Sequence, residues 1–290
     1  MSRIEEALRI AAGNSYSPTA VEEPAPRAAQ TTLTYFPREH RLDEEHPGAD
    51  VAKRWASARG QAASEQPVST DDGLQRKFGL RDATPVAIEQ YRRLGGGLLE
   101  LQSLHGVKTV MVTSAAPREG KSLSVANLAV TLSETYRFRV LLIDADLRRP
   151  SLHHIFKLSN DKGLSEGLRA EAGPLTVVQV SPRLSVLPAG LPASNPLAAL
   201  TSERMRTVVA EAATAFDWVL LDAPPVGLMP DATLLVPLTH GVLFVIAAGI
   251  TPHALVERAI TEIGRENILG TILNQVEPDS IPAANYTEYY

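Results

Sequence analysis

The sequence predicts an α/β fold with a mostly parallel sheet and helices on both of its faces, preceded by a largely disordered N-terminal region. From about residue 84 onward, short and almost wholly apolar segments alternate with longer segments that have helical spacing. Buried strands alternating with helices are typical of a parallel sheet that is covered on both faces. Before residue 80, large apolar residues are sparse and no period is sustained.

The first 80 residues are expected to form a linker with a short helix. Residues 2–12 are the predicted helix, with Ser2 as N-cap and Ile4 and Leu8 on one side. Residues 13–75 are rich in Pro, Ala, Glu, Arg and Gln, which is a composition typical of disorder. The pattern therefore places the folded domain at 81–278, followed by a flexible tail at 279–290.

The first half of the domain contains two strands and two helices. A helix is expected at 85–105, although Gly95, Gly96 and Gly97 lower the helix propensity of its middle. The apolar segment VKTVMVTS predicts a strand at 107–114, and a helix follows at 121–135. The segment RVLLI predicts the next strand at 139–143, which ends at Asp144.

The second half continues the same alternation. Short apolar runs predict strands at 184–187, 218–221, 242–247 and 268–273. Helices are expected at 202–215 and 252–265, because apolar residues recur there at helical spacing. About 200 residues are ample for one core of this kind.

The composition excludes several classes of protein. The chain has 290 residues, a formal net charge of −5 and no cysteine. The negative charge gives no basic excess, so we expect no nucleic-acid partner. The lack of cysteine excludes thiolate zinc sites and iron–sulfur clusters. No segment approaches the roughly 20 apolar residues that span a bilayer, so we expect a cytoplasmic protein that reaches any membrane through a partner.

A phosphate-binding loop is predicted between the first strand and the helix after it. The segment Ala115-Ala-Pro-Arg-Glu-Gly120-Lys121-Ser122 follows a strand and opens a helix, which is the context that such a loop needs. Backbone N–H groups there converge on a phosphate, and the helix dipole adds positive potential. Lys121 would reach the β- and γ-phosphates, and the Ser122 hydroxyl would ligate Mg²⁺. The alternative is a chance Gly-Lys-Ser sequence in an ordinary loop.

With this loop, the expected fold is that of a P-loop NTPase. The candidate nucleotide contacts are Ala116, Pro117, Arg118, Glu119, Gly120, Lys121, Ser122 and Leu123.

Three aspartates lie at the ends of predicted strands. The segment VLLIDAD ends in Asp144 and Asp146, and VLLDAPP contains Asp222. Carboxylates at the carboxyl ends of parallel strands face the crevice where ligands bind. We expect Asp222 and Asp144 to act with Ser122 in holding Mg²⁺, and Asp146 to accept a proton from an attacking hydroxyl. The alternative is that these aspartates only cap the turns that follow.

The loop, the segment VLLIDADLRRP and the segment VLLDAPPV together resemble the bacterial tyrosine kinases of exopolysaccharide and capsule loci. The similarity covers residues 88–274, and the N-terminal MSRIEEAL is similar to the autokinases encoded with exosortase genes. The resemblance implies an ATP- and Mg²⁺-dependent protein-tyrosine kinase with Lys121, Asp144 and Asp146 as catalytic residues. It also implies Asn274 as an adenine contact, although a strand-end turn residue is an equal alternative.

The C-terminal tail fits this resemblance. Three of the seven tyrosines, Tyr286, Tyr289 and Tyr290, lie in the last five residues. An exposed terminal tyrosine cluster has no packing rationale, since aromatic residues contribute to stability when they are buried. The resemblance implies that this cluster is phosphorylated in trans by a neighbouring subunit. The alternative is a terminal segment that docks and buries the tyrosines.

Two departures from related families bear on function. Partition and cell-division ATPases of the same fold carry a second lysine where Ala116 stands here, which disfavours that alternative function and favours the kinase. The kinase family also carries Glu-x-x-Arg-x-x-Arg in the helix before the sheet, a motif that helps its subunits form a ring. Here Glu89 and Arg92 match but Gly95 replaces the last arginine, so a weaker or different oligomer is expected.

The resemblance further implies biological partners. Family members regulate polysaccharide chain length and export together with a membrane polysaccharide co-polymerase, also called a chain-length determinant protein. A tyrosine phosphatase would reset the tail. We therefore expect recruitment to the inner face of the plasma membrane by such a partner. A non-catalytic nucleotide-binding regulator is a third alternative.

Overall fold

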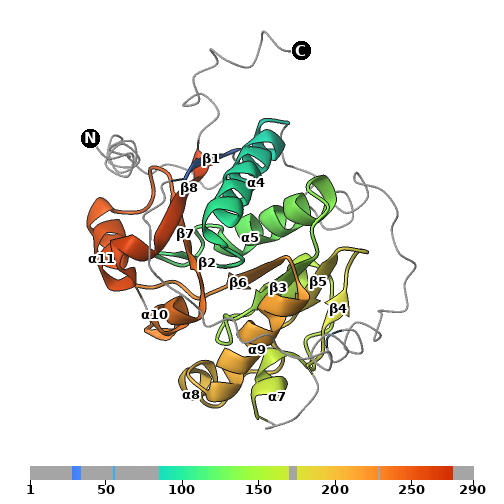
Figure 1. Cartoon of the computed structure of the whole chain (residues 1–290). Helices are drawn as coiled ribbons and strands as arrows, with labels where there is room; N and C mark the ends of the chain where they lie inside the picture. The colour runs from blue at the N-terminus through green and yellow to red at the C-terminus, as the bar shows by residue number, and fades with distance from the viewer. Residues whose placement is uncertain (1–27, 34–54, 56–84, 170–174, 228, 277–290) are drawn as a thin grey trace.

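The computed structural model describes residues 28–33, 55, 85–169, 175–227 and 229–276 of the chain. These residues form one eight-stranded sheet with the strand order β1-β8-β7-β2-β6-β3-β5-β4. Helices cover both faces of the sheet (Figure 1), as the α/β prediction required. Among the described residues, no helix combines the length and apolar character needed to cross a bilayer.

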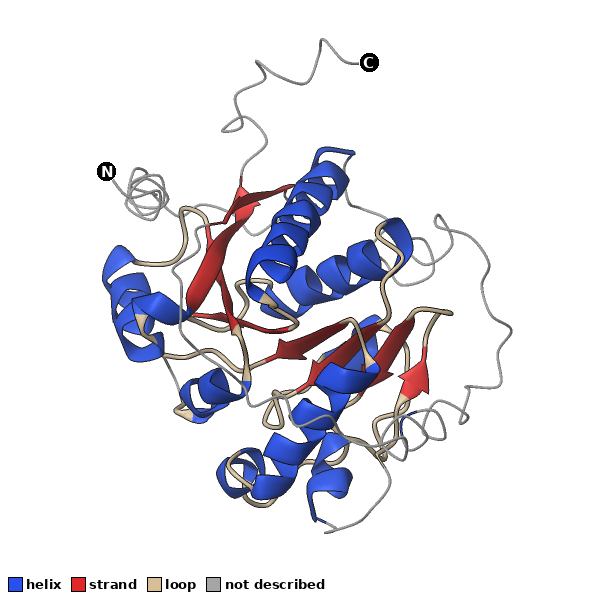
Figure 2. Ribbon diagram, in the orientation of Figure 1, coloured by secondary structure: helices blue, strands red, loops and turns tan. Residues whose placement is uncertain are grey.

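The strands are short and mostly buried. Their bounds are β1 Ala28–Leu33, β2 Thr109–Ser114, β3 Val140–Asp144, β4 Val178–Gln179, β5 Leu184–Leu187, β6 Trp218–Asp222, β7 Gly241–Ala247 and β8 Ile268–Val276. The six inner strands from β8 to β5 run parallel, and β1 and β4 close the two edges as antiparallel strands. Figure 2 shows these strands as the central layer between the helices.

The helices connect the parallel strands. The α-helices are α4 Pro85–His105, α5 Lys121–Val130, α6 Leu152–Ile155, α7 Leu164–Arg169, α8 Pro196–Leu200, α9 Glu203–Ala215, α10 Asp231–Leu235 and α11 His253–Ile263. One π-helical turn, η2 Thr131–Thr135, extends α5, and 3₁₀ turns lie at η3 Val236–Leu238 and η4 Arg265–Asn267. The Ser202 side chain caps α9 by accepting a hydrogen bond from the Met205 N–H.

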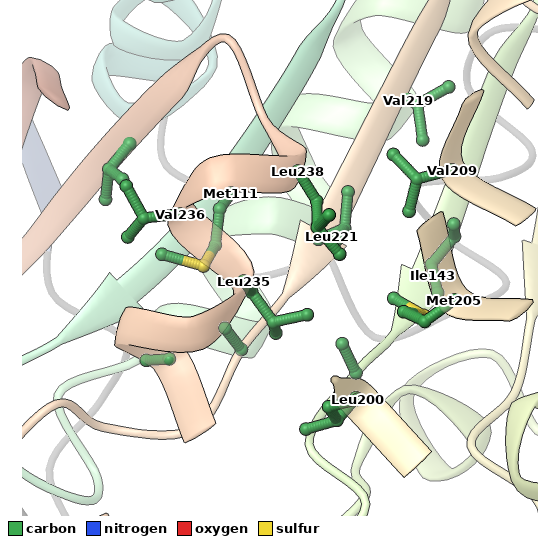
Figure 3. Close-up of a cluster of buried hydrophobic side chains, with 14 of the residues drawn as sticks. Met111, Ile143, Leu200, Met205, Val209, Val219, Leu221, Leu235, Val236 and Leu238 are labelled. Atoms are coloured by element: carbon green, nitrogen blue, oxygen red, sulfur yellow. The ribbon is translucent and has the colours of Figure 1, made fainter. Parts of the chain in front are cut away.

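Each face of the sheet carries its own apolar core. On one face, Leu94 and Leu98 of α4 and Val125 and Leu128 of α5 are buried against the strands. On the other face, side chains of α8, α9 and α10 pack on the opposite side of the same strands (Figure 3). A sheet that is buried on both sides explains why its strands are apolar throughout instead of alternating.

Strand β2 marks the point where the chain changes direction across the sheet. It pairs with β7 on one side and with β6 on the other. In open parallel sheets, ligands bind outside the carboxyl ends of the strands at such a switch point. The topology therefore places the end of β2, and the loop that follows it, at the expected ligand site.

Most of the expected elements are confirmed with small shifts at their ends. The helix at 85–105 has the expected bounds and is continuous through its three glycines. The strand expected from residue 107 begins at Thr109, and the helix expected at 121–135 is α5 continued by η2. The short elements α6, α7, α8, α10 and β4 were not predicted, because segments of two to six residues are too short to show a period.

Two parts of the expected linker differ from the prediction. Residues 28–33 form β1, which pairs antiparallel with β8. Trp55 is 1% exposed in the core, and its ring meets Phe216 edge-on at 5.7 Å between centroids. An unpaired edge strand and an apolar surface are both stabilised when another segment covers them. The helix expected at 2–12 and the tail with Tyr286, Tyr289 and Tyr290 lie outside the described residues.

Candidate active site

The loop between β2 and α5 has the backbone shape expected of a phosphate-binding loop. Gly120 is the N-cap of α5 with φ +87°, a conformation that favours glycine. A β-carbon on Gly120 would also collide with the Asn274 side-chain amide. Arg118 adopts φ +67° without being glycine, so neighbouring groups must hold the loop in this strained form.

The ammonium group of Lys121 lies at the centre of the acidic strand ends. Its Nζ is 3.1 Å from Asp146 Oδ2 and 3.4 Å from Asp222 Oδ1, and it donates to Ser122 Oγ at 3.2 Å. Burial would lower the pKa of Lys121, but Asp222 and Asp146 outweigh burial and raise it. The lysine is therefore charged at neutral pH and lies within reach of three predicted site residues.

Asp144 and Asp222 face each other across neighbouring parallel strands. The two residues are register partners in β3 and β6, and both are fully buried. Burial raises the pKa of Asp222, while Lys121 opposes the shift. Burial and the nearby Asp222 raise the pKa of Asp144 to about 8, although backbone donors act in the opposite direction. Burial is the first cause of both shifts, and a neighbouring aspartate adds to each of them, Asp222 to the pKa of Asp144 and Asp146 to the pKa of Asp222.

The Asp144 carboxylate organises the loop that follows β3. Its Oδ2 accepts the N–H groups of Ser151 and Leu152, both at 3.0 Å, and its Oδ1 accepts the Asp146 N–H at 3.3 Å. Both oxygens are thus engaged with backbone. This arrangement gives Asp144 a positioning role at the site, beside the catalytic and metal roles that the sequence suggested.

Asp146 is placed between the lysine and its own loop. It accepts the Lys121 ammonium on Oδ2 and the Arg149 N–H on Oδ1 at 3.0 Å. Its side chain is 6% exposed. A carboxylate held in this way, next to a charged lysine, has a fixed direction toward the loop where phosphate groups are expected to bind.

The residues present fit a magnesium ion. Asp222 Oδ2 is buried and has no hydrogen-bond partner in the structure, which is costly unless a cation or water is bound there. The Ser122 hydroxyl lies beside the same lysine. Among the described residues no group of three or more acidic or histidine side chains could hold a metal by itself. A carboxylate, a hydroxyl and nucleotide phosphates are the usual set for Mg²⁺ in such sites.

Asn274 reaches the loop from the end of β8. Its side-chain Nδ2 donates to the Glu119 carbonyl at 2.9 Å, so the residue contacts the predicted phosphate-binding loop. The adenine contact itself stays a prediction.

Two residues that contact the loop, Thr251 and Gln275, were missed by sequence reasoning. Thr251, which follows β7, donates its hydroxyl to the buried Glu119 carboxylate. The Gln275 side chain donates to the Arg118 carbonyl at 3.0 Å. Thr251 lies four residues beyond the end of β7 and Gln275 lies inside β8. Neither is a polar residue at the end of an apolar strand, which is the pattern that predicted Asp144 and Asp222.

Arg148 is paired within its own chain. Its guanidinium binds Asp231, the first residue of α10, in two hydrogen bonds of 2.6 and 3.1 Å. Asp231 is 1% exposed. This ion pair joins the loop after β3 to the helix after β6.

Comparison with known proteins identifies the family. The nucleotide-binding domain family of CobQ, CobB, MinD and ParA matches residues 110–288. Tyrosine-protein kinase YwqD of Bacillus subtilis (strain 168) is 37% identical over 190 residues, which are 64% of this chain and 80% of YwqD. The chain belongs to the bacterial tyrosine kinases of this nucleotide-binding family. The chain is thus a protein-tyrosine kinase with a P-loop fold.

Two further relatives agree with this assignment. The solved BceF tyrosine kinase domain superposes on this kinase with a TM-score of 0.63 at 26% identity, covering 95% of this chain and 97% of BceF. The succinoglycan biosynthesis transport protein ExoP of Rhizobium meliloti (strain 1021) is 35% identical over 183 residues. That match covers 60% of this kinase but 23% of ExoP, so most of the length of ExoP lies outside the match.

Proposed function

We propose that this kinase transfers the γ-phosphoryl group of ATP to the tyrosines of its own C-terminal tail. The observation that carries the proposal is the position of Lys121, whose ammonium lies within 3.4 Å of Asp146, Asp222 and Ser122 at the start of α5. Phosphoryl transfer requires a charged lysine, a helix N-terminus and a carboxylate close together. Here all three lie at the carboxyl ends of the parallel strands.

The charge of each side chain and the groups that it contacts suggest its role in phosphoryl transfer. Lys121 and the backbone N–H groups of the loop would stabilise the charge that develops on the phosphoryl oxygens. Asp146, directed by Lys121 and the Arg149 N–H, would orient the incoming tyrosine hydroxyl and accept its proton. Asp144 would keep Asp146 in place through the loop after β3. The chain's contribution is therefore positioning and electrostatics.

Magnesium would be held by Ser122 and Asp222. Bound there, it would neutralise charge between the β- and γ-phosphates. The unpartnered Asp222 Oδ2 is the oxygen of this chain best placed to take part, either directly or through water. Asp144 is the less favoured ligand, because backbone N–H groups already engage both of its oxygens.

Tyr286, Tyr289 and Tyr290 are proposed as the acceptors. The described chain ends at Val276 of β8, two residues after Asn274, which contacts the loop. Fourteen residues follow in the sequence. At about 3.3 Å per extended residue, the tail is long enough to reach a neighbouring molecule. We therefore propose transfer in trans between copies of the chain.

The proposed setting is the regulation of exopolysaccharide or capsule synthesis and export. ExoP is named as a succinoglycan biosynthesis transport protein. A separate membrane polysaccharide co-polymerase is proposed to recruit and activate the kinase at the inner face of the plasma membrane. A tyrosine phosphatase is proposed to reverse the modification.

The test is intact mass spectrometry of purified protein after incubation with ATP and Mg²⁺. We expect additions of one phosphate mass each, mapped to the final six residues. Lys121→Met should show none. Lys121→Met carrying a mass tag should become phosphorylated when mixed with untagged wild type, because transfer occurs in trans.

Two outcomes separate the proposal from a positioning ATPase. The triple variant Tyr286→Phe, Tyr289→Phe, Tyr290→Phe should lose phosphate incorporation while it still binds nucleotide. If the wild type hydrolyses ATP but incorporates no phosphate, even with a cytoplasmic segment of a co-polymerase present, the autokinase proposal is wrong. The positioning ATPase would then be the better description.

A further inference from the structure

Glu119 carries a buried carboxylate that the proposed phosphoryl transfer does not use. The residue lies in the phosphate-binding loop, one position before Gly120, yet it is 3% exposed. The two residues before it, Pro117 and Arg118, are exposed. A buried carboxylate is costly unless its oxygens receive hydrogen bonds. Its partners therefore indicate what the side chain does.

Both oxygens of this carboxylate have a donor. Oε2 accepts the Ala116 N–H at 2.6 Å, which closes the loop upon itself across three residues. Oε1 accepts the hydroxyl of Thr251, which lies in the loop between β7 and α11. The side chain thus ties the start of the phosphate-binding loop to the loop that follows β7. The Ala116 N–H is therefore engaged by Glu119 within the loop and is not free to donate to a phosphate.

The end of β8 secures the same stretch from another direction. Asn274 donates to the Glu119 carbonyl at 2.9 Å and Gln275 donates to the Arg118 carbonyl at 3.0 Å. Arg118 and Gln275 both have positive φ, at 67° and 58°. Backbone in this region is strained for residues other than glycine, and it persists only where its surroundings hold it.

We propose that Glu119 is a positioning residue that preorganises the loop for nucleotide phosphates. Its carboxylate fixes Ala116, Thr251 fixes its carboxylate, and the amide groups of the following residues stay directed toward the phosphate position. A loop that is already ordered loses less entropy when it binds a ligand. The inference deepens the proposed function and rests on its nucleotide-binding part alone.

The positioning role of Glu119 is proposed to depend on the hydrogen bonds of its side chain and not on its negative charge. A glutamine in place of Glu119 would still accept the Ala116 N–H with its oxygen. Its amide N–H₂ would donate to the Thr251 hydroxyl, which has lone pairs that can accept. Glutamine should therefore preserve the loop, whereas alanine should release it. A role based on negative charge would fail equally in both variants.

The experiment measures binding of ADP with Mg²⁺ to the full chain by titration calorimetry. Glu119→Ala should weaken binding about tenfold, the size expected from losing one to two hydrogen bonds. Glu119→Gln should stay within about threefold of wild type, and Thr251→Val should fall between them because it removes one of the two bonds. In steady-state assays the KM for ATP should rise more than kcat falls.

The structure offers a matched control in Glu134. This residue is 8% exposed, lies in η2, and accepts the Ser181 hydroxyl at 2.6 Å. It resembles Glu119 in burial and in having a hydroxyl donor, but the length of α5, about 15 Å at 1.5 Å per residue, separates it from the loop. Glu134→Gln and Glu134→Ala should leave the ADP affinity unchanged.

Two results would overturn the inference. The first is ADP affinity of Glu119→Ala within about twofold of wild type while its melting temperature without nucleotide is retained. The second is binding by Glu119→Gln as weak as that of Glu119→Ala. ADP binding needs no phosphoryl transfer, so the inference can hold even if the tail tyrosines receive no phosphate.

Discussion

The ring of Tyr136 packs on the backbone of α4 at Gly95. A β-carbon on Gly95 would lie 2.6 Å from Tyr136 Cε2, and the Tyr136 hydroxyl donates to the Arg92 carbonyl at 2.7 Å. The contact explains how α4 remains continuous through three glycines. It also explains why arginine cannot occupy position 95 here, since that position faces the Tyr136 ring instead of solvent. Glu89 instead lies 3.8 Å from both Arg92 and Arg93 on the exposed side.

Gly95→Ala should therefore destabilise the protein although alanine is the better helix former. Overpacking should outweigh the gain in helix propensity and lower the free energy of unfolding by about 1 kcal/mol. In a Tyr136→Ala background the same change should become stabilising by about 0.5–1 kcal/mol, because only the propensity term remains. Urea unfolding of the four proteins measures both values. If Gly95→Ala has the same effect in both backgrounds, Tyr136 does not set the requirement for glycine.

Much of the fold and the site could be predicted because the informative patterns are local. A buried parallel strand is a short apolar run, and VLLID and WVLLD each end at a site aspartate. The phosphate-binding loop is one contiguous segment between a strand and a helix. Placing Lys121, Asp146 and Asp222 together then required only that the strands be parallel and adjacent.

The features that sequence reasoning missed depend on contacts between distant segments. Nothing in the pattern around Trp55 indicates that it meets Phe216. The pairing of Arg148 with Asp231 joins residues 83 positions apart, and that of Glu119 with Thr251 spans 132 positions. Such partners follow from the three-dimensional arrangement of loops at the strand ends, which the periodicity of single segments does not specify.

Asp144→Asn should lower stability before any nucleotide is added. All three partners of the carboxylate are backbone N–H donors, two on Oδ2 and one on Oδ1. In either orientation the new amide would direct its own N–H₂ at one of these donors. Because burial and Asp222 raise the pKa of Asp144 to about 8, the hydrogen bonds are compared at about pH 4, where the protonated carboxyl still has a lone pair for the Asp146 N–H and an amide nitrogen has none. We expect the free energy of unfolding of Asp144→Asn to lie about 1 kcal/mol below that of wild type at this pH. The deficit should shrink as the pH rises toward 8, because the raised folded-state pKa costs wild type stability there and the amide does not titrate.

Asp161→Asn provides the matched surface control, since Asp161 is exposed and bonds only locally, to Ser159. Its unfolding free energy should stay within about 0.5 kcal/mol of wild type. Equal stability of Asp144→Asn and Asp161→Asn in urea at pH 4 would show that Asp144 does not organise the loop after β3.

The ion pair between Arg139 and Asp217 should make stability depend on pH below neutrality. Burial raises the pKa of Asp217, but the side-chain and backbone hydrogen bonds from Arg139 outweigh it and hold the pKa below its ordinary value. A lowered folded-state pKa contributes stability above the unfolded-state pKa and loses it as the pH falls through the folded-state pKa. The pair joins the start of β3 to the start of β6 at 2.8 Å.

Asp217→Asn should therefore cost about 1 kcal/mol at pH 7, a value kept small because both side chains are partly exposed. The difference from wild type should shrink as the pH is lowered below about 4, where the aspartate of the unfolded chain becomes protonated. Glu262→Gln, which breaks the exposed pair with Arg258, should cost less than about 0.5 kcal/mol. A difference between Asp217→Asn and wild type that does not change between pH 7 and pH 3 would contradict the assignment.

Trp55 should contribute to the stability of the domain although it lies in the segment that composition assigns to a linker. Its side chain is 1% exposed and packs edge-on against Phe216. Trp55→Ala should lower the free energy of unfolding by about 3 kcal/mol, and Trp55→Phe by less, because phenylalanine keeps part of the apolar contact. Circular dichroism in urea is the suitable measurement, since tryptophan fluorescence changes with the substitution itself.

The same contact predicts the behaviour of a shortened chain. A chain beginning at residue 81, the expected domain boundary, lacks both Trp55 and β1, so it should be at least as unstable as Trp55→Ala. It should also expose the edge of β8 that β1 covers, and an uncovered edge strand favours association between chains. Light scattering against chain concentration would detect this. A shortened chain that is as stable and as monodisperse as the full chain would place the boundary at 81 and assign no structural role to Trp55.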